Sequence, residues 1–190
     1  MKLKKIKLKS VSSTNDVAIN LIKNNCLKPS IIIADEQTKG RGTMGKKWIS
    51  KKGNLFISIY FEIDALKLNF DKFAILNPYI IRKIISKYSK YKINIKWPND
   101  LFINKKKVCG VLQEVLEFKN KKFLIVGIGV NTLFAISNKK FKSIALNNCT
   151  DKLISNISII KDFKEAYEKF LFDIRVYKIS YINQKYLKEL

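Results

Sequence analysis

A glycine-rich segment at residues 40–48 contains the residue types best suited to binding an anion. Its glycines at positions 40, 42 and 45 allow the backbone to approach a ligand closely, and Arg41 places a permanent positive charge between two of them. The glycine spacing matches the dinucleotide-binding fingerprint and nearly matches a Walker A loop. Both motifs must open a helix, and a Walker A loop also requires Ser or Thr where Lys47 stands. Trp48 and a predicted strand follow instead. We therefore expect an anion-binding loop of neither type, with a long ligand-free hairpin loop as the alternative.

A second candidate is the pentapeptide Lys96-Trp97-Pro98-Asn99-Asp100, whose lysine ends a short strand that we expect to be buried. A lysine at such a strand end can present a compact positive charge to a cleft, and the following proline fixes the backbone. The alternative is a surface lysine beside an Asn-Asp turn. The chain has 35 lysines, so position alone does not decide between the two interpretations.

A third candidate is the run Gly127-Ile128-Gly129-Val130-Asn131-Thr132. Glycines inside an apolar strand indicate close approach by a ligand or by another backbone. Tight strand packing or a β-bulge explains them equally well, so both interpretations stay open.

The residues that are missing exclude other chemistries. The chain has no histidine, which rules out Ser-His and Cys-His catalysis and histidine-ligated metals. Its three cysteines, Cys26, Cys109 and Cys149, are far apart and form neither a disulfide framework nor a zinc motif. This usage predicts a reducing, cytoplasmic location. We also expect no signal peptide and no membrane segment, because the apolar runs are short.

The formal net charge of +23 first suggests a nucleic-acid partner, since 38 Lys and Arg oppose 15 Asp and Glu. However, only three residues are arginine, the side chain that makes bidentate phosphate contacts. Lys, Ile and Asn together supply 81 of the 190 residues, a composition typical of an AT-rich genome. We interpret the charge as a solvated lysine surface and expect no specific nucleic-acid partner.

The elements that must position these candidates form an α+β order, with hairpin-connected strands in the middle and helices at both ends. A helix is expected from a capping box at Ser13 and Asp16 to about Asn25, a second over residues 71–87 with a kink or break at Pro78, and a third beginning at Asp162. The predicted strands span residues 5–9, 31–35, 55–61, 93–96, 101–103, 108–115 and 123–130. No linker divides the chain, so we expect one domain over residues 1–190.

Seven motifs occur in an order that closely resembles the catalytic domain of biotin–protein ligases, also called biotin–[acetyl-CoA-carboxylase] ligases. Each motif is weak alone, but their order from about Ser10 to Thr132 is specific. They are Ser13-Thr14-Asn15, Asp35-Glu36-Gln37-Thr38-Lys39-Gly40-Arg41-Gly42, Trp48, Gly53-Asn54-Leu55, Lys96-Trp97-Pro98-Asn99-Asp100-Leu101, Lys107-x-x-Gly110-Val111-Leu112-x-Glu114 and Gly127-Ile128-Gly129-Val130-Asn131.

This resemblance implies a mixed, largely antiparallel sheet flanked by helices, similar to class II aminoacyl-tRNA synthetases and lipoate ligases. It implies a two-step ligase that converts biotin and ATP to biotinyl-5′-AMP and then transfers biotin to a lysine of a biotin carboxyl carrier protein, an acetyl-CoA carboxylase subunit. Mg²⁺ is implied with ATP, without identified ligands. The nucleophiles are the biotin carboxylate and the acceptor amine, so the missing histidine is no obstacle.

The resemblance also implies a biotin-binding set of polar and glycine positions. Its members are Ser13, Thr14, Asn15, Gln37, Arg41, Gly42, Thr43, Lys96 and Lys107. Lys96 and Arg41 correspond to the catalytic cations, which stabilise charge as the carboxylate meets the α-phosphate. Lys107 corresponds to a second lysine on the carboxylate side of biotin. Trp48 and Asn131, together with Arg41, correspond to the nucleotide-binding positions.

Three departures from the family pattern modify this expectation. Many relatives have a second arginine where Thr43 stands, so adenylate retention is expected to be leakier here. Only 12 residues precede Ser13, so we expect no N-terminal DNA-binding domain, and the tail reads as helical, so we expect no C-terminal β-barrel. The alternatives are a lipoate or octanoate ligase of the same superfamily and a basic RNA-binding module. The oligomeric state and the acceptor carboxylase are not determined by the sequence.

Overall fold

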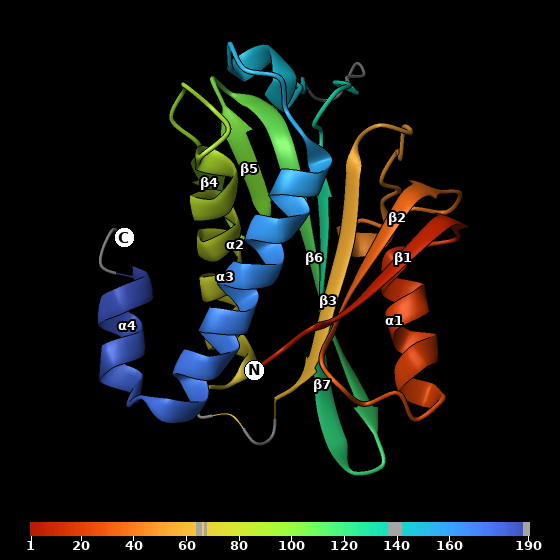
Figure 1. Ribbon diagram of the computed structural model, residues 1–190, viewed down its shortest axis with the longest axis vertical. Coiled ribbons are helices and arrows are strands. Elements are labelled where there is room, and N and C mark those ends of the chain that lie inside the picture. Colours follow the sequence, from red (N-terminus) through yellow and green to blue (C-terminus); the bar gives the residue numbers. More distant parts are fainter. Residues whose placement is uncertain (64–65, 67, 137–141, 188–190) are drawn as a thin grey trace.

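A computed structural model describes residues 1–63, 66, 68–136 and 142–187. Among these residues, the core of the fold is a seven-stranded sheet in the order β1-β2-β3-β7-β6-β5-β4 (Figure 1). β1 and β2 are parallel, and every other neighbouring pair is antiparallel. The predicted mixed, largely antiparallel sheet is confirmed.

The strands follow the predicted pattern and are mostly longer than predicted. The turns that join β5 to β6 and β6 to β7 place Asn104, Lys105, Lys119 and Asn120 at positive φ. The strand bounds are β1 Lys4–Val11, β2 Ser30–Gln37, β3 Leu55–Glu62, β4 Asn94–Lys96, β5 Asp100–Ile103, β6 Lys106–Phe118 and β7 Lys121–Val130.

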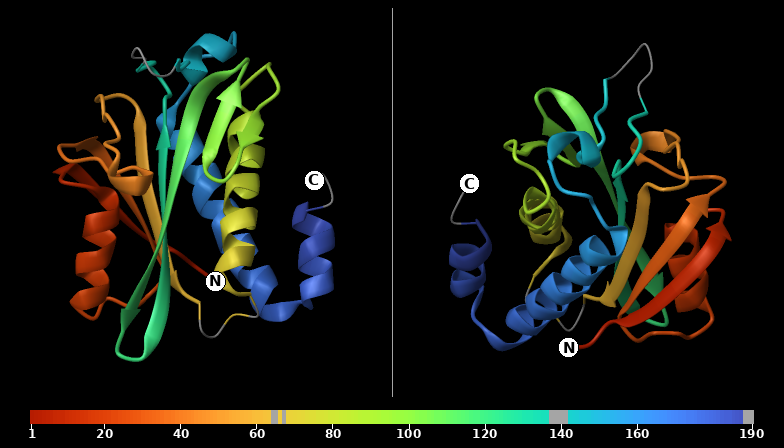
Figure 2. Two further views of the ribbon diagram at one scale, coloured as in Figure 1. Left: turned by 180° about the vertical axis from the view of Figure 1, so that it is seen from behind. Right: turned by 45° about the horizontal axis from the view of Figure 1, so that its top comes forward.

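Helices cover both faces of the sheet (Figures 1 and 2). α1 (Thr14–Lys23) lies alone on one face, while α2 (Phe70–Ser86) and α3 (Asn156–Val176) pack together on the other. α4 (Ile179–Leu187) follows α3 and contacts α2. Single 3-10 turns occur at Thr43–Gly45 and Leu146–Cys149.

Alternation along the strands divides the core into two clusters, because successive strand residues point to opposite faces. Ile32, Tyr60 and Ile125 are buried under α1. Their neighbours Ile31 and Ile59 belong to the larger cluster under α2 and α3. On β7, the side of the sheet that faces α1 therefore continues from residue 125 to residues 127 and 129, where both residues are glycines.

Three details of the sequence-based prediction are wrong. α2 continues through Pro78 as one helix, so the predicted break is absent; the Ala74 carbonyl, to which Pro78 has no N–H to donate, accepts a hydrogen bond from Nε2 of Gln113 at 3.3 Å instead. α3 begins at Asn156 with Ser155 as its N-cap, so Asp162 lies inside the helix, where its carboxylate accepts hydrogen bonds from Lys87 and Tyr88. β4 is mostly exposed at the sheet edge rather than buried.

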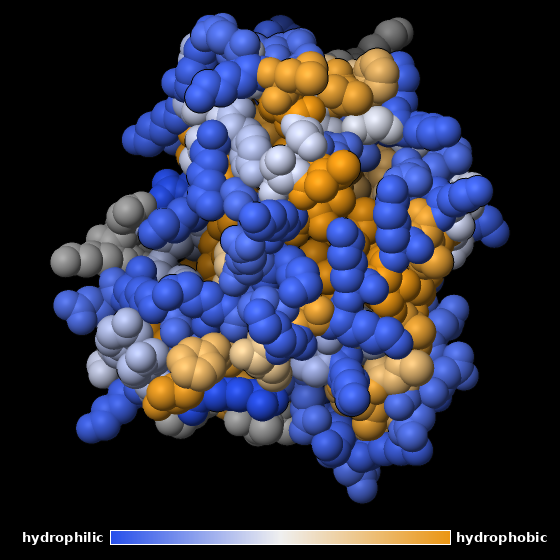
Figure 3. Space-filling model, in the orientation of Figure 1, coloured by the Kyte–Doolittle hydropathy of each residue, from blue (hydrophilic) through white to orange (hydrophobic). Residues whose placement is uncertain are grey.

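The molecule presents a largely hydrophilic face in the orientation of Figure 3. On the face in Figure 3, hydrophilic side chains lie across the whole molecule with apolar atoms visible between them, which agrees with a solvated lysine surface. Among the described residues, no helix combines the length and the apolar character needed to cross a membrane.

Candidate active site

A cavity of about 650 Å³ opens at the end of the sheet face that carries α1. Its walls come from the N-terminus of α1, the 40–49 segment, the β4–β5 hairpin and the glycine-containing parts of β6 and β7. The structure places around this one cavity every residue that the sequence singled out for a site: Ser13, Thr14, Asn15, Gln37, Arg41, Gly42, Thr43, Trp48, Lys96, Lys107 and Asn131.

The floor of the cavity is built from glycines because two side chains lie directly on the strands. Gly110 and Gly129 are register partners on β6 and β7, and a Cβ at either would come within 2.6 Å of the Trp48 ring. A Cβ at Gly127 would lie 2.9 Å from Cγ of Asn15. The glycines therefore let the Trp48 and Asn15 side chains lie directly on β6 and β7. The sequence analysis considered approach by a ligand or a backbone, tight strand packing and a β-bulge, but not approach by side chains.

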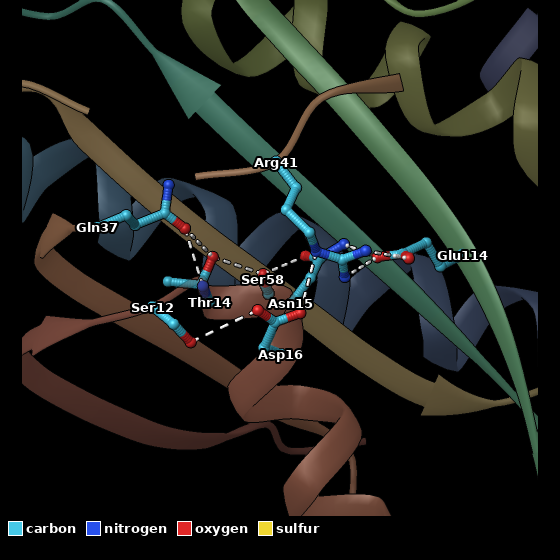
Figure 4. Close-up of polar contacts among 8 residues, drawn as sticks. All are labelled: Ser12, Thr14, Asn15, Asp16, Gln37, Arg41, Ser58 and Glu114. Atoms are coloured by element: carbon cyan, nitrogen blue, oxygen red, sulfur yellow. Dashed lines mark hydrogen bonds and ion pairs between the residues drawn. The ribbon is translucent and has the colours of Figure 1, made fainter. Parts of the chain in front are cut away.

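The N-terminus of α1 is held by a chain of polar side chains (Figure 4). Oε1 of Gln37 accepts hydrogen bonds from the Thr14 backbone N–H at 2.8 Å and from its hydroxyl at 3.1 Å. The Ser58 hydroxyl lies 2.7 Å from Oγ1 of Thr14 and also contacts Oδ1 of Asn15. Ser13 is the N-cap residue but makes no side-chain capping bond, so the predicted capping box is wrong: Gln37, from β2, satisfies the helix end instead.

Arg41 reaches from the loop to β6 and pairs with two carboxylates (Figure 4). Its Nη1 and Nη2 donate to the two oxygens of Glu114 at 2.8 and 2.7 Å, and its Nε lies 3.0 Å from Oδ1 of Asp16. Asn15 donates to the same Glu114 carboxylate at 2.6 Å. The anion that the glycine-rich loop holds in this structure is thus the protein's own glutamate.

The cavity lysines differ in their surroundings. Lys107 Nζ lies 2.6 Å from the Asp100 carboxylate and 5.1 Å from the centre of the Trp48 ring. Lys96 is exposed at the end of β4, with Nζ 5.5 Å from the Phe102 ring centre. Lys96 therefore has the free ammonium group that the sequence suggested, although its strand is not buried.

The Lys96–Asp100 segment is tied to the loop opposite. The Trp97–Pro98 peptide bond is cis. Nδ2 of Asn99 donates to Oγ1 of Thr43 at 3.2 Å and to the backbone carbonyl of Val111 at 3.3 Å. Asn99 therefore joins the glycine-rich loop to β6 across the cavity.

On the β6–β7 side, Trp48 and Asn131 provide polar atoms beside the glycine floor. Nε1 of Trp48 is buried and has no hydrogen-bond partner among the described residues. Asn131 is buried, and its Nδ2 donates to the backbone carbonyl of Lys107 at 3.4 Å. The indole N–H therefore lies against β7 with no acceptor among the described residues.

Among the described residues that line the cavity, none is a cysteine or histidine that could serve covalent catalysis. The Cys109 thiol faces the other side of the sheet from the glycines, and burial raises its pKa, so it stays protonated. No group of three metal-ligating side chains occurs in the described ranges. The acidic residues of the site, Asp16, Asp100 and Glu114, are each ion-paired.

Three residues of the site network were not assigned a role from the sequence. Ser58 is the one small polar residue in the apolar run of β3, and it faces α1, so its type and position could have identified it from the sequence. Glu114 ends one of the seven motifs, but its partner is 73 residues away. Asp16 was interpreted only as part of a helix cap.

Comparisons with known proteins agree with this geometry. The model of the biotin/lipoate A/B protein ligase family matches residues 8–131. The bifunctional ligase/repressor BirA of Bacillus spizizenii is 30% identical over 165 residues, which cover 84% of this chain. The chain spans only about half of that relative, 51% of its length.

Two solved structures share the fold. The biotin protein ligase of Aquifex aeolicus in complex with biotin and ATP superposes with a TM-score of 0.75 at 29% identity, covering 90% of this chain and 72% of the other. The Leishmania major biotin protein ligase in complex with biotinyl-5-AMP gives 0.72 at 26% identity, covering 97% and 80%. With a family match over 124 consecutive positions and the same sheet and helices, this chain belongs to the biotin/lipoate A/B protein ligase family.

Proposed function

We propose that this protein activates biotin with ATP to biotinyl-5′-AMP and transfers the biotinyl group to a lysine of a biotin carboxyl carrier protein. The observation that carries the proposal is one cavity that joins the polar side chains at the α1 N-terminus to Lys96, Lys107 and a glycine floor. Relatives whose structures hold biotin with ATP, or biotinyl-5-AMP, support this assignment.

In the first step, a carboxylate oxygen of biotin attacks the α-phosphorus of ATP, and pyrophosphate leaves. Ser13, Thr14, Asn15 and Gln37 supply donors and acceptors for the polar ureido ring in an otherwise apolar slot. The cations of the cavity oppose the negative charge that accumulates when two anions meet. Of the three cations that the sequence assigned, Lys96 is the best placed, because Arg41 and Lys107 are paired with carboxylates and no carboxylate in the described part of the chain pairs with Lys96.

In the second step, the ε-amine of the acceptor lysine attacks the carbonyl carbon of the mixed anhydride, and AMP leaves with its bonding electron pair. The enzyme contributes position and charge, because both nucleophiles come from substrates. We assign Trp48 and Asn131, which both line the cavity beside the glycine floor, to its nucleotide side.

Mg²⁺ enters this scheme as part of the Mg–ATP substrate. The site carboxylates are occupied by Arg41 and Lys107, and Mg²⁺ keeps several waters and binds substrate phosphates in such sites. The three cysteines are free thiols, which agrees with activity in the reducing cytoplasm.

The test is direct. The purified protein is incubated with biotin, α-labelled ATP, Mg²⁺ and a biotin carboxyl carrier domain, and the products are separated. Biotinyl-AMP formed without the carrier, and biotinylated carrier formed with it, support the proposal. Parallel reactions with lipoate and octanoate test the superfamily alternative, and preferential use of either acid refutes the assignment to biotin.

A further inference from the structure

Glu114 connects two parts of the cavity wall that come from different elements. It lies on β6, and its carboxylate receives three hydrogen bonds: two from the Arg41 guanidinium and one from the Asn15 amide. Arg41 belongs to the glycine-rich loop, while Asn15 is the second residue of α1. One side chain on a strand therefore fixes a loop and a helix N-terminus together (Figure 4).

The contact determines the orientation of both partners. The bidentate geometry fixes the plane of the guanidinium, because both terminal nitrogens meet a carboxylate oxygen. Nδ2 of Asn15 donates a hydrogen bond to Glu114, and Oδ1 of Asn15 accepts one from the Ser58 hydroxyl. The amide group therefore cannot turn over without losing both hydrogen bonds. The Arg41 and Glu114 side chains are 37% and 27% exposed, so this ion pair contributes more to geometry than to overall stability.

Apart from the packing of Trp48 on β6 and β7, the loop has few other side-chain attachments among the described residues. Gln37 donates to Ser50 at 2.9 Å, and Asn99 donates to Thr43 at 3.2 Å. Arg41 also lies 3.0 Å from Asp16 through Nε, but its pair with Glu114 is the one with two hydrogen bonds. Loss of the Glu114 charge should therefore release the loop while leaving the sheet intact.

We propose that Glu114 is a positioning residue for biotin activation, acting through Arg41 and Asn15 without touching the reacting atoms. This inference rests on the proposed function, because it assigns Arg41 and Asn15 to the biotin side of the cavity. A displacement of about 1 Å in such a constellation costs about 10²-fold in rate. Glu114→Gln keeps the shape of the side chain but replaces one carboxylate oxygen by an N–H₂ group. That group faces at least one of the three N–H donors of Arg41 and Asn15, so at least one hydrogen bond is replaced by a repulsion between two donors.

The first measurement is limited trypsin digestion with mass spectrometry of the cleaved bonds. Glu114→Gln is expected to speed cleavage after Arg41, Lys46 and Lys47 by about 10-fold, with no increase at sites outside the loop. The matched control is Glu117→Gln, which removes the same charge from an exposed position on the same strand. A purely structural defect would raise cleavage throughout the chain, and unchanged loop cleavage would overturn the proposal.

The second measurement is biotin affinity by calorimetry together with the rate of biotin-dependent ATP–pyrophosphate exchange. Glu114→Gln is expected to weaken biotin binding about 10-fold and to slow exchange 10- to 100-fold, while Glu117→Gln behaves as wild type. Wild-type affinity and exchange in Glu114→Gln overturn the positioning role. Absence of biotin binding in the wild-type protein instead refutes the proposed function, and the proteolysis result then still reports on the Glu114 contact.

Discussion

Adding one methyl group at either of two glycines of β7 should separate biotin binding from nucleotide binding. Gly127 and Gly129 lie on the same face of the same strand, but different side chains lie on them. A Cβ at position 127 meets Asn15, at 2.9 Å from Cγ, whereas a Cβ at position 129 meets the Trp48 ring, at 2.6 Å from Nε1. The substitutions Gly127→Ala and Gly129→Ala therefore perturb different parts of one cavity.

The sizes of the two effects follow from how freely each neighbour can move. Ordinary carbon–carbon contact requires about 3.5–4.0 Å, so each neighbour must move by roughly 1 Å. Asn15 is 2% exposed and tied to Ser58 and Glu114, so Gly127→Ala should cost about 1–3 kcal/mol of stability and up to about 10²-fold in the biotin-dependent step. Trp48 lies on a loop and its Nε1 has no partner, so its ring moves without breaking a hydrogen bond.

The assay is biotin-dependent ATP–pyrophosphate exchange at varied biotin and varied ATP, with thermal unfolding measured in parallel. Gly127→Ala should raise the KM for biotin about 10- to 100-fold and lower the melting temperature. Gly129→Ala should raise mainly the KM for ATP and leave the melting temperature nearly unchanged. Each variant serves as the control for the other. Equal increases of both KM values in both variants would refute the division of the cavity.

Three further predictions use other parts of the molecule. Lys96→Met should slow biotinyl-AMP formation by about 10²–10³-fold without changing the melting temperature. The control Lys92→Met, at another exposed position, should form biotinyl-AMP at the wild-type rate. Near-normal pyrophosphate release by Lys96→Met would contradict its catalytic role. Thr43→Arg should reduce biotin labelling of an unrelated bystander protein, because a guanidinium beside the adenylate replaces a neutral hydroxyl; equal labelling by both proteins argues against a leaky loop. Asp173→Asn should lower the unfolding free energy by about 1–3 kcal/mol in denaturant titrations and leave the exchange rate unchanged. The reason is that Asp173 accepts hydrogen bonds from Lys185 and Tyr186 and so holds α4 on α3. An unchanged unfolding midpoint would show that α4 is held by packing alone.

Local chemistry explains why much of the fold could be predicted. Alternating and β-branched runs identified the strands, since each half-buried strand must repeat its apolar side every second residue. The exposed hairpin turns were marked by lysine and asparagine, and the positive φ of Asn104 and Asn120 is the conformation that these turns require. The start of α3 was missed because Asp162, an acidic residue inside the helix, has the residue type of a helix start.

For the candidate site, the lining positions could be predicted from the sequence, but their interaction partners could not. The types and order of residues such as Lys96, Arg41 and Gln37 were sufficient to select the positions that line the cavity. Their partners were not predictable, because the pairing of Arg41 with Glu114 spans 73 residues and depends on which strand face points toward α1. A one-residue change of register would have placed Glu114 on the opposite face.

The amino-acid sequence by itself determined the strand and helix periods, the absence of histidine chemistry and the set of residues available to the site. Only the tertiary structure decided that Arg41 is held by a glutamate, that Gln37 rather than Ser13 satisfies the helix end, and that Asn15 and Trp48 lie on glycines. The physical reason is the range of the interactions involved. Backbone and hydrophobic preferences act over a few neighbouring residues, whereas hydrogen bonds and close contacts require side chains from distant strands to meet within about 3 Å.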